Sequence, residues 1–167
     1  MASPNSKHPV ALTIAGSDPG GGAGLQADLK TFAALGVYGY SVITEVIAQN
    51  SSKVANVEAV SVEMVEAQLN TLALECGPRA MKTGALANAA IVKAVARAIE
   101  RLKLPAPVVD PVIVSSSGAL LIGPKGERAI HDSASDPKAR LGYAKLSYQR
   151  QSIARLSDQS TKTGSFA

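Results

Sequence analysis

Residues 10 to 35 read VALTIAGSDPGGGAGLQADLKTFAAL, and this stretch decides the fold that we expect. Its first six residues form an apolar run, which is typical of a buried strand. The run breaks at Gly16 into a glycine-rich turn that carries one carboxylate, Asp18. Apolar residues then recur at helical spacing, at Leu25, Leu29, Phe32 and Leu35. The stretch therefore predicts a strand, a turn and a helix, an arrangement in which backbone N–H groups converge on an anion or a polar ligand.

Two common glycine loops do not match this turn. A Walker loop ends in Gly-Lys-Ser/Thr, whereas Gly24 is followed by Leu25 and Gln26. The dinucleotide fingerprint has glycine at its first, third and sixth positions; Gly20 and Gly22 fit, but the sixth residue is Leu25. The turn is therefore neither a standard nucleoside-triphosphate loop nor a standard NAD loop, and a flexible connection remains the alternative.

The next hundred residues continue to alternate between strand and helix patterns. Strands are predicted at 40–47, 79–83 and 108–109, with a short edge strand at 54–60. Ser61 and Asn88 suit the N-caps of two helices, whose apolar stripes are Val65, Leu69, Leu72 and Cys76, and Ile91, Val95, Ile99 and Leu102. This alternation predicts a mostly parallel sheet with helices on both faces.

Polar and glycine residues stand where several of these strands end: Gly16 to Asp18, Gln49-Asn50, Gly84 and Asp110. In an open α/β sheet, ligands bind outside the carboxyl ends of the strands. We therefore expect these residues to share one rim of the sheet and to form a binding site there.

Composition narrows the class of protein. Of 167 residues, 46% are hydrophobic, and Cys76 is the only cysteine, which excludes an internal disulfide and fits a reducing cytosol. No apolar stretch approaches the roughly 20 residues of a membrane span, and the first nine residues lack the apolar core of a signal peptide. We expect a cytoplasmic protein of one domain, or part of one, that does not bind membranes.

The net charge of +4 is unevenly distributed. Residues 1–132 contain 11 Lys plus Arg and 11 Asp plus Glu, whereas residues 133–167 contain six basic residues and two acidic ones. This last segment is rich in serine and has no clear apolar period, which is typical of disorder rather than of a folded basic surface. We therefore expect no nucleic-acid partner.

Residues 15–32 resemble the N-terminal signature of the hydroxymethylpyrimidine/phosphomethylpyrimidine kinases of thiamine biosynthesis, which belong to the ribokinase-like superfamily. Three later stretches agree in order and spacing: 40–50, which ends in Ala-Gln-Asn, Met81-Lys82-Thr83-Gly84, and 109–112 with Ser117-Gly118. The resemblance covers residues 9 to about 132 and only the N-terminal half of the family's domain. It implies a ribokinase-like, doubly wound, mostly parallel α/β sheet that is truncated after about residue 132 and followed by a divergent tail, 133–167.

The resemblance implies ATP- and Mg²⁺-dependent phosphorylation of 4-amino-5-hydroxymethyl-2-methylpyrimidine and of its monophosphate. It places five residues against the pyrimidine: Gln49, Asp28, Gly16, Ile47 and Val112. A glutamine amide both donates and accepts hydrogen bonds, as the aminopyrimidine edge requires. Without the motif, Gln49 would be read as an ordinary strand-end residue, and Asp28 as a residue that stabilises a helix N-terminus. For Asp110 two interpretations are equally open: it lies near the phosphates, or it only accepts hydrogen bonds from nearby backbone N–H groups. No catalytic residue and no metal ligand are assigned.

Residues 133–167 depart from the family, which has a Gly-Thr-Gly-Cys or Gly-Thr-Gly-Asp turn in its second half to stabilise charge on the transferred phosphate. That turn is absent, so we expect the chain by itself to have little kinase activity, and a cut sheet edge to favour aggregation or homo-oligomers. A non-catalytic pyrimidine-binding or interaction remnant and a pyridoxal kinase-like enzyme are the alternatives. If the reading frame is moved forward by one base, codons for Ser133-Ala134-Ser135 can encode Leu-Pro-Leu, and codons for 142–146 can encode Val-Thr-Pro-Asn. Both stretches occur in the family, which suggests a frameshift near Asp132.

Overall fold

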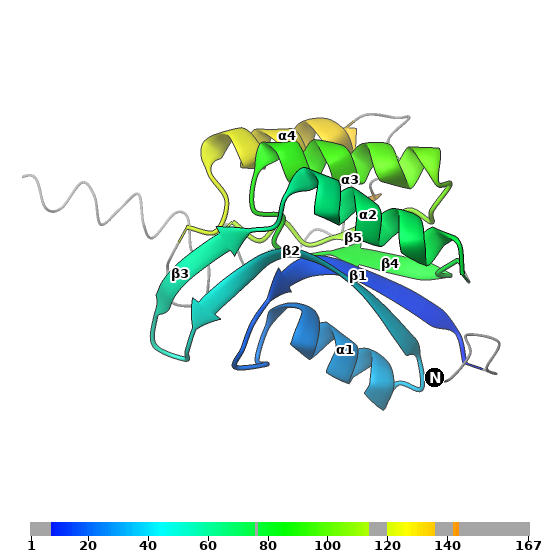
Figure 1. The fold of residues 1–167 in the computed structure, drawn as a ribbon, viewed down its shortest axis with the longest axis horizontal. Helices are drawn as coiled ribbons and strands as arrows, with labels where there is room; N and C mark the ends of the chain where they lie inside the picture. Colours follow the sequence, from blue (N-terminus) through cyan, green and yellow to red (C-terminus); the bar gives the residue numbers. More distant parts are fainter. Residues whose placement is uncertain (1–7, 76, 114–119, 136–141, 144–167) are drawn as a thin grey trace, which may run out of the picture.

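The computed structural model describes residues 8–75, 77–113, 120–135 and 142–143. Their strands form one sheet in the order β3-β2-β1-β4-β5-β6 (Figure 1). The strands are β1 Val10–Ser17, β2 Tyr38–Gln49, β3 Val54–Ala59, β4 Ala80–Thr83, β5 Val108–Val109 and β6 Gly142–Tyr143. All neighbours are parallel except β2 and β3. The predicted α/β class is confirmed, and the reversal of strand order at β1 is the doubly wound topology.

Helices cover both faces of the sheet, as predicted. Helix α1 (Gly24–Ala34) lies on one face, and α2 (Val62–Ala73), α3 (Ala89–Arg101) and α4 (Pro124–Ser135) lie on the other (Figure 1). The core between them is aliphatic: Leu12, Ile14 and Val42 come from the central strands, and Leu69 and Ile91 from the helices. Burial of this apolar surface is the main force that holds the layers together.

The two predicted N-caps are confirmed. The Ser61 hydroxyl accepts a hydrogen bond of 3.2 Å from the Met64 N–H. The Asn88 side-chain oxygen, Oδ1, accepts hydrogen bonds from the N–H groups of Ala90 and Ile91, at 3.0 and 3.1 Å. Each cap satisfies backbone donors that a helix leaves without a partner in its first turn.

The predicted apolar face of the first helix is wrong at Leu35. The helix ends at Ala34, and the Leu35 side chain is 73% exposed. Gly36 adopts φ +69°, its N–H donates to the Ala33 carbonyl, and the Val37 N–H donates to the Phe32 carbonyl. These two bonds form a Schellman motif, which turns the chain out of the helix before Leu35 can join the stripe.

The sequence did not predict α4 or β6. Helix α4 continues across the expected boundary at residue 132 to Ser135, and Gly142–Tyr143 pair with β5 within the segment expected to be disordered. The disorder predicted for 136–141 and 144–167, and the burial predicted for Cys76, lie outside the described residues. In the described part of the chain, no helix has the length and apolar character needed to cross a bilayer.

Candidate functional site

A cavity of about 300 Å³ opens at the carboxyl ends of β1, β2, β4 and β5. Its wall contains all five residues that the resemblance placed against a pyrimidine: Gly16, Asp28, Ile47, Gln49 and Val112. It also contains Asp18, Lys82, Gly84 and Asp110. The expected convergence of strand ends on one rim is therefore confirmed as geometry.

Asn50, the neighbour of Gln49, has another role. Its side-chain oxygen accepts hydrogen bonds from the N–H groups of Ser52 and Lys53, at 2.9 and 3.0 Å. These bonds close the turn between β2 and β3, and Asn50 does not line the cavity. The turn thereby fixes the end of β2, where Gln49 stands.

The glycine turn is organised around Asp18. The Asp18 carboxylate accepts hydrogen bonds from the backbone N–H groups of Gly20, Gly22 and Ala23, at 2.9, 3.0 and 2.9 Å. The sequence predicted that such donors would converge on a ligand, and for these three donors that is wrong, because the anion is a side chain of the same turn. A carboxylate two residues ahead of flexible glycines reaches their N–H groups at little cost.

The environment of Asp18 links the turn to Gln49. Burial by itself would raise the pKa of Asp18, but hydrogen bonds from the Gln49 side chain and from Ala23, Gly20 and Gly22 outweigh it, so the pKa is lowered. Asp18 is therefore ionised at neutral pH. The charge orients the Gln49 amide, whose remaining hydrogen-bonding groups stay available to a ligand.

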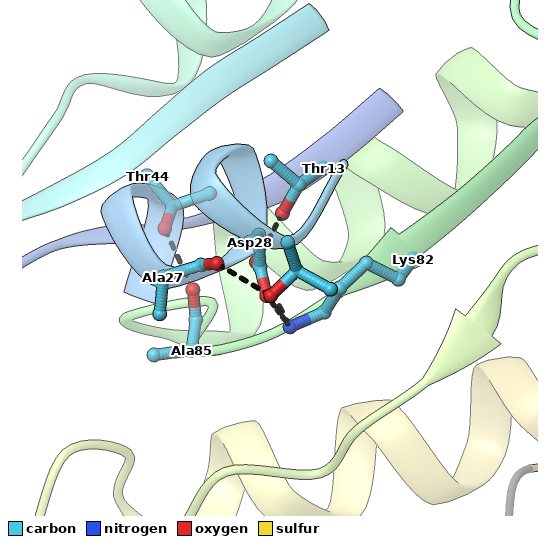
Figure 2. A network of polar contacts seen from close by, with 7 residues as sticks. Thr13, Ala27, Asp28, Thr44, Lys82 and Ala85 are labelled. Atoms are coloured by element: carbon cyan, nitrogen blue, oxygen red, sulfur yellow. Dashed lines mark hydrogen bonds and ion pairs between the residues drawn. The ribbon is translucent and has the colours of Figure 1, made fainter. Parts of the chain in front are cut away.

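A second carboxylate, Asp28 on α1, is held between two strands. Thr13 of β1 donates its hydroxyl to Asp28 Oδ2 at 2.6 Å, and Lys82 Nζ of β4 lies 3.1 Å from Oδ1 and 3.0 Å from Oδ2 (Figure 2). Asp28 is therefore cross-linked to the sheet and does not merely complement the helix dipole. Its carboxylate faces the cavity in a fixed orientation.

The sequence reasoning assigned no role to Lys82, although Lys82 belongs to the Met-Lys-Thr-Gly stretch. Among the described residues that line the cavity, Lys82 is the only cation, against the carboxylates of Asp18, Asp28 and Asp110. Burial raises the pKa of Asp110, the charge of Lys82 opposes that rise, and the charge of Asp28 adds to it. The sequence did contain a signal: Lys82 lies one residue before the end of a predicted strand, and Gly84 follows that end.

Glu45 of β2 is a further residue that the sequence reasoning missed. It is 0% exposed, and neither carboxyl oxygen has a hydrogen-bond partner among the residues that the structure describes. Burial raises its pKa to about 7. The adjacent Thr44 is also buried, but its hydroxyl donates to the Ala85 carbonyl at 2.7 Å (Figure 2).

The described residues do not bring three metal-ligating side chains together. What the cavity offers is a mixed wall, with apolar side chains such as Ile47 and Val112 beside amide and carboxylate groups. Such a wall suits a small, flat, polar ring.

The phosphomethylpyrimidine kinase family matches residues 18–141 of the chain. The hydroxymethylpyrimidine/phosphomethylpyrimidine kinase of Rhizobium meliloti (strain 1021) is 49% identical over 121 residues, which are 72% of this chain and 45% of that protein. The enzyme of the same description from Bacillus subtilis (strain 168) is 48% identical over 112 residues, 67% of this chain and 41% of that protein. The chain thus spans less than half the length of these relatives.

Solved structures show the same fold. A phosphomethylpyrimidine kinase from Clostridium difficile 630 is similar with a TM-score of 0.68 and 40% identity, over 73% of this chain and 53% of that one. A Staphylococcus aureus pyridoxal kinase in complex with pyridoxal is similar with a TM-score of 0.65 and 35% identity, over 75% and 46%.

Proposed function

Because this chain belongs to the phosphomethylpyrimidine kinase family, we propose that its cavity binds 4-amino-5-hydroxymethyl-2-methylpyrimidine for ATP-dependent phosphorylation of the hydroxymethyl group and then of the monophosphate. The observation that supports this most is the convergence of Gln49, Asp28, Gly16, Ile47 and Val112 on one cavity. These residues come from four separate segments of a ribokinase-like fold, namely β1, α1, β2 and the chain after β5, and a ligand at the rim would lie close to all of them.

The chemistry of the wall fits this ligand. The cavity of about 300 Å³ lies at the lower end of the roughly 300–1,000 Å³ typical of small-molecule sites. Ile47 and Val112 provide apolar contact for the ring faces, and Gln49 pairs with the aminopyrimidine edge. Asp28, fixed by Thr13 and Lys82, accepts a hydrogen bond from the hydroxyl group of the ligand and so orients it.

The charges around the cavity favour the uncharged alcohol over its monophosphate. Asp18, Asp28 and Asp110 surround the site, and Lys82, the single cation among the described lining residues, is already paired with Asp28. ATP supplies the phosphoryl group when bound. Phosphoryl transfer depends on positioning and on charge stabilisation at the phosphate, and the Gly-Thr-Gly turn that serves this purpose in the family is absent from the sequence. We expect this chain alone to bind the pyrimidine and to turn it over slowly.

Isothermal titration of the purified 167-residue chain with the hydroxymethylpyrimidine tests the binding. Gln49→Ala should weaken affinity by about one to two powers of ten, because a buried ligand edge without its partner costs about 1–3 kcal/mol. Asn56→Ala, an exposed amide on the neighbouring β3, is the matched control and should leave affinity unchanged. Equal losses in both variants would contradict the role of Gln49.

Turnover and ligand choice separate the alternatives. ATP-dependent phosphorylation is followed for this chain beside a full-length relative, with the pyrimidine and with pyridoxal. Pyrimidine binding without turnover supports a binding remnant, and preferential pyridoxal binding supports the pyridoxal kinase alternative. Turnover within tenfold of the full-length relative would refute the expectation that this chain is slow.

A further inference from the structure

Glu45 lies on the face of β2 that forms the cavity wall. Side chains alternate between the two faces of a strand, so Glu45 shares a face with Ile47 and Gln49, which line the cavity. Exposure follows this alternation, since Glu45 is 0% exposed, Val46 55% and Ile47 5%. Glu45 is thus the next residue inward from the two that line the site.

Gly16 is the point of contact between Glu45 and the cavity. A Cβ atom at Gly16 would lie 2.9 Å from Glu45 Cγ, 3.0 Å from Oε1 and 3.3 Å from Ile47 Cδ1. The Glu45 carboxyl group therefore packs directly against the bare backbone of Gly16, which itself lines the cavity. Gly16 and Ile47, the two residues that meet at this point, both belong to the cavity wall.

A register irregularity places the carboxyl group there. Ala15 pairs with Ile43 and Ser17 with Val46, so β2 has one residue more than β1 across Gly16. Bulges of this kind redirect side chains next to functional sites. Thr44 finds a partner in the Ala85 carbonyl, but in the described part of the chain neither carboxyl oxygen of the buried Glu45 has a hydrogen-bond partner.

The charge state of Glu45 has consequences for the wall. Burial alone raises its pKa to about 7, and the charged groups around the cavity, Asp18, Asp28 and Lys82, make no hydrogen bond or ion pair with it. Exposed Glu58 on the adjacent β3 makes no hydrogen bond with it either. A neutral carboxyl group is tolerated in this environment, whereas a carboxylate needs donors or water.

Resting on the proposed function, we propose that Glu45 is a positioning residue of the pyrimidine site: its neutral carboxyl group holds Gly16 and Ile47 in the wall that contacts the ring, and its ionisation weakens pyrimidine binding. Glu45 does not touch the ligand. It sets the shape of the surface that does.

The test is the affinity of the full chain for the hydroxymethylpyrimidine between pH 5.5 and 8.5, measured by titration calorimetry. Wild type, Glu45→Gln and Glu45→Leu are compared, with Glu58→Gln as the control for an exposed glutamate. Circular dichroism at each pH establishes that each protein is folded. Because the ligand's own protonation affects all proteins alike, the informative quantity is the ratio of each variant's affinity to that of wild type.

Wild type and Glu58→Gln should lose about tenfold in affinity relative to Glu45→Gln between pH 6 and pH 8, because the neutral fraction of a carboxyl group with a pKa of about 7 falls from about nine-tenths to about one-tenth over that range. Glu45→Gln keeps the shape without the charge and should match wild type at pH 6; Glu45→Leu should be weaker at every pH but equally free of the wild-type inflection. If the ratio of the affinity of Glu45→Gln to that of wild type does not change with pH, the proposed role of Glu45 is overturned, while the proposed function stands. Absence of binding by folded wild type at pH 6 overturns the proposed function, and this inference with it.

Discussion

Replacement of Asp18 by alanine tests whether the glycine turn depends on an internal anion. The change removes the acceptor of three backbone N–H groups, those of Gly20, Gly22 and Ala23, and the partner of Gln49. Hydrogen bonds to a charged group contribute about 1.5–3 kcal/mol each. The three N–H groups belong to residues at the surface, where water replaces much of what is lost. We therefore expect a net loss of about 2–4 kcal/mol in the free energy of unfolding.

Urea unfolding of the full chain, followed by far-ultraviolet circular dichroism, measures this loss. With a slope of about 1–3 kcal/mol per molar urea, the midpoint should fall by roughly 1–2 M. Asp18→Asn keeps one acceptor oxygen without the charge and should lose about half as much. Asp132→Asn, an exposed carboxylate in α4, controls for the change in net charge.

The pH dependence gives a second readout of the same contact. The folded chain holds the pKa of Asp18 below its ordinary value of 3.8, so the stability contributed by this carboxylate is present above that pH and is lost as the pH falls through the folded pKa. The difference between wild type and Asp18→Asn should therefore shrink as the solution is acidified below about pH 4. A loss under about 0.5 kcal/mol for Asp18→Ala at pH 7 would refute the argument that this side chain organises the turn.

Three further changes have outcomes set by single positions. Gly24→Ala, at φ +57°, places a Cβ against the Gly16 carbonyl oxygen, whereas the Cβ of Gly36→Ala, at φ +69°, meets open space. Gly36→Ala should lower the free energy of unfolding by about 1 kcal/mol, and Gly24→Ala should lower it clearly more. Equal urea midpoints for the two variants would contradict the predicted clash. Asn88→Ala should cost about 1 kcal/mol through loss of the α3 cap, and an unchanged melting temperature would show that the cap does not matter. Because burial raises the pKa of Glu45 from 4.5 to about 7, wild-type stability relative to Glu45→Gln should be greatest below pH 4.5 and decline by about 3 kcal/mol up to pH 7. A pH-independent difference between these two unfolding free energies is the contrary result.

Local patterns determined much of the fold. The apolar run at 10–15, the caps at Ser61 and Asn88 and the helical stripes specify elements through residues close together in the chain, and the structure has these elements, although Leu35 lies outside the first helix. The order of strands and helices then implies a parallel sheet with ligand-binding loops at one rim. From that logic Gly16, Gln49, Gly84 and Asp110 were expected at the rim, and they line one cavity. Asp28, Ile47 and Val112, which also line it, were named only by the family resemblance. Helix α4 and the two-residue strand β6 lack such local signals, and the sequence did not predict them.

The roles of the polar side chains at the rim depended on tertiary structure. Lys82 meets Asp28 across 54 positions in the chain, and Thr13 meets it across 15, so no local pattern could reveal the cross-link. As a charged residue, Glu45 is expected at the surface from the sequence. An extra residue in β2 opposite Gly16 instead places it in the interior, without a hydrogen-bond partner among the described residues. Sequence periodicity reports which face of an element is apolar, but hydrogen bonds, burial and charge depend on which distant segments meet, and only the packed sheet decides that.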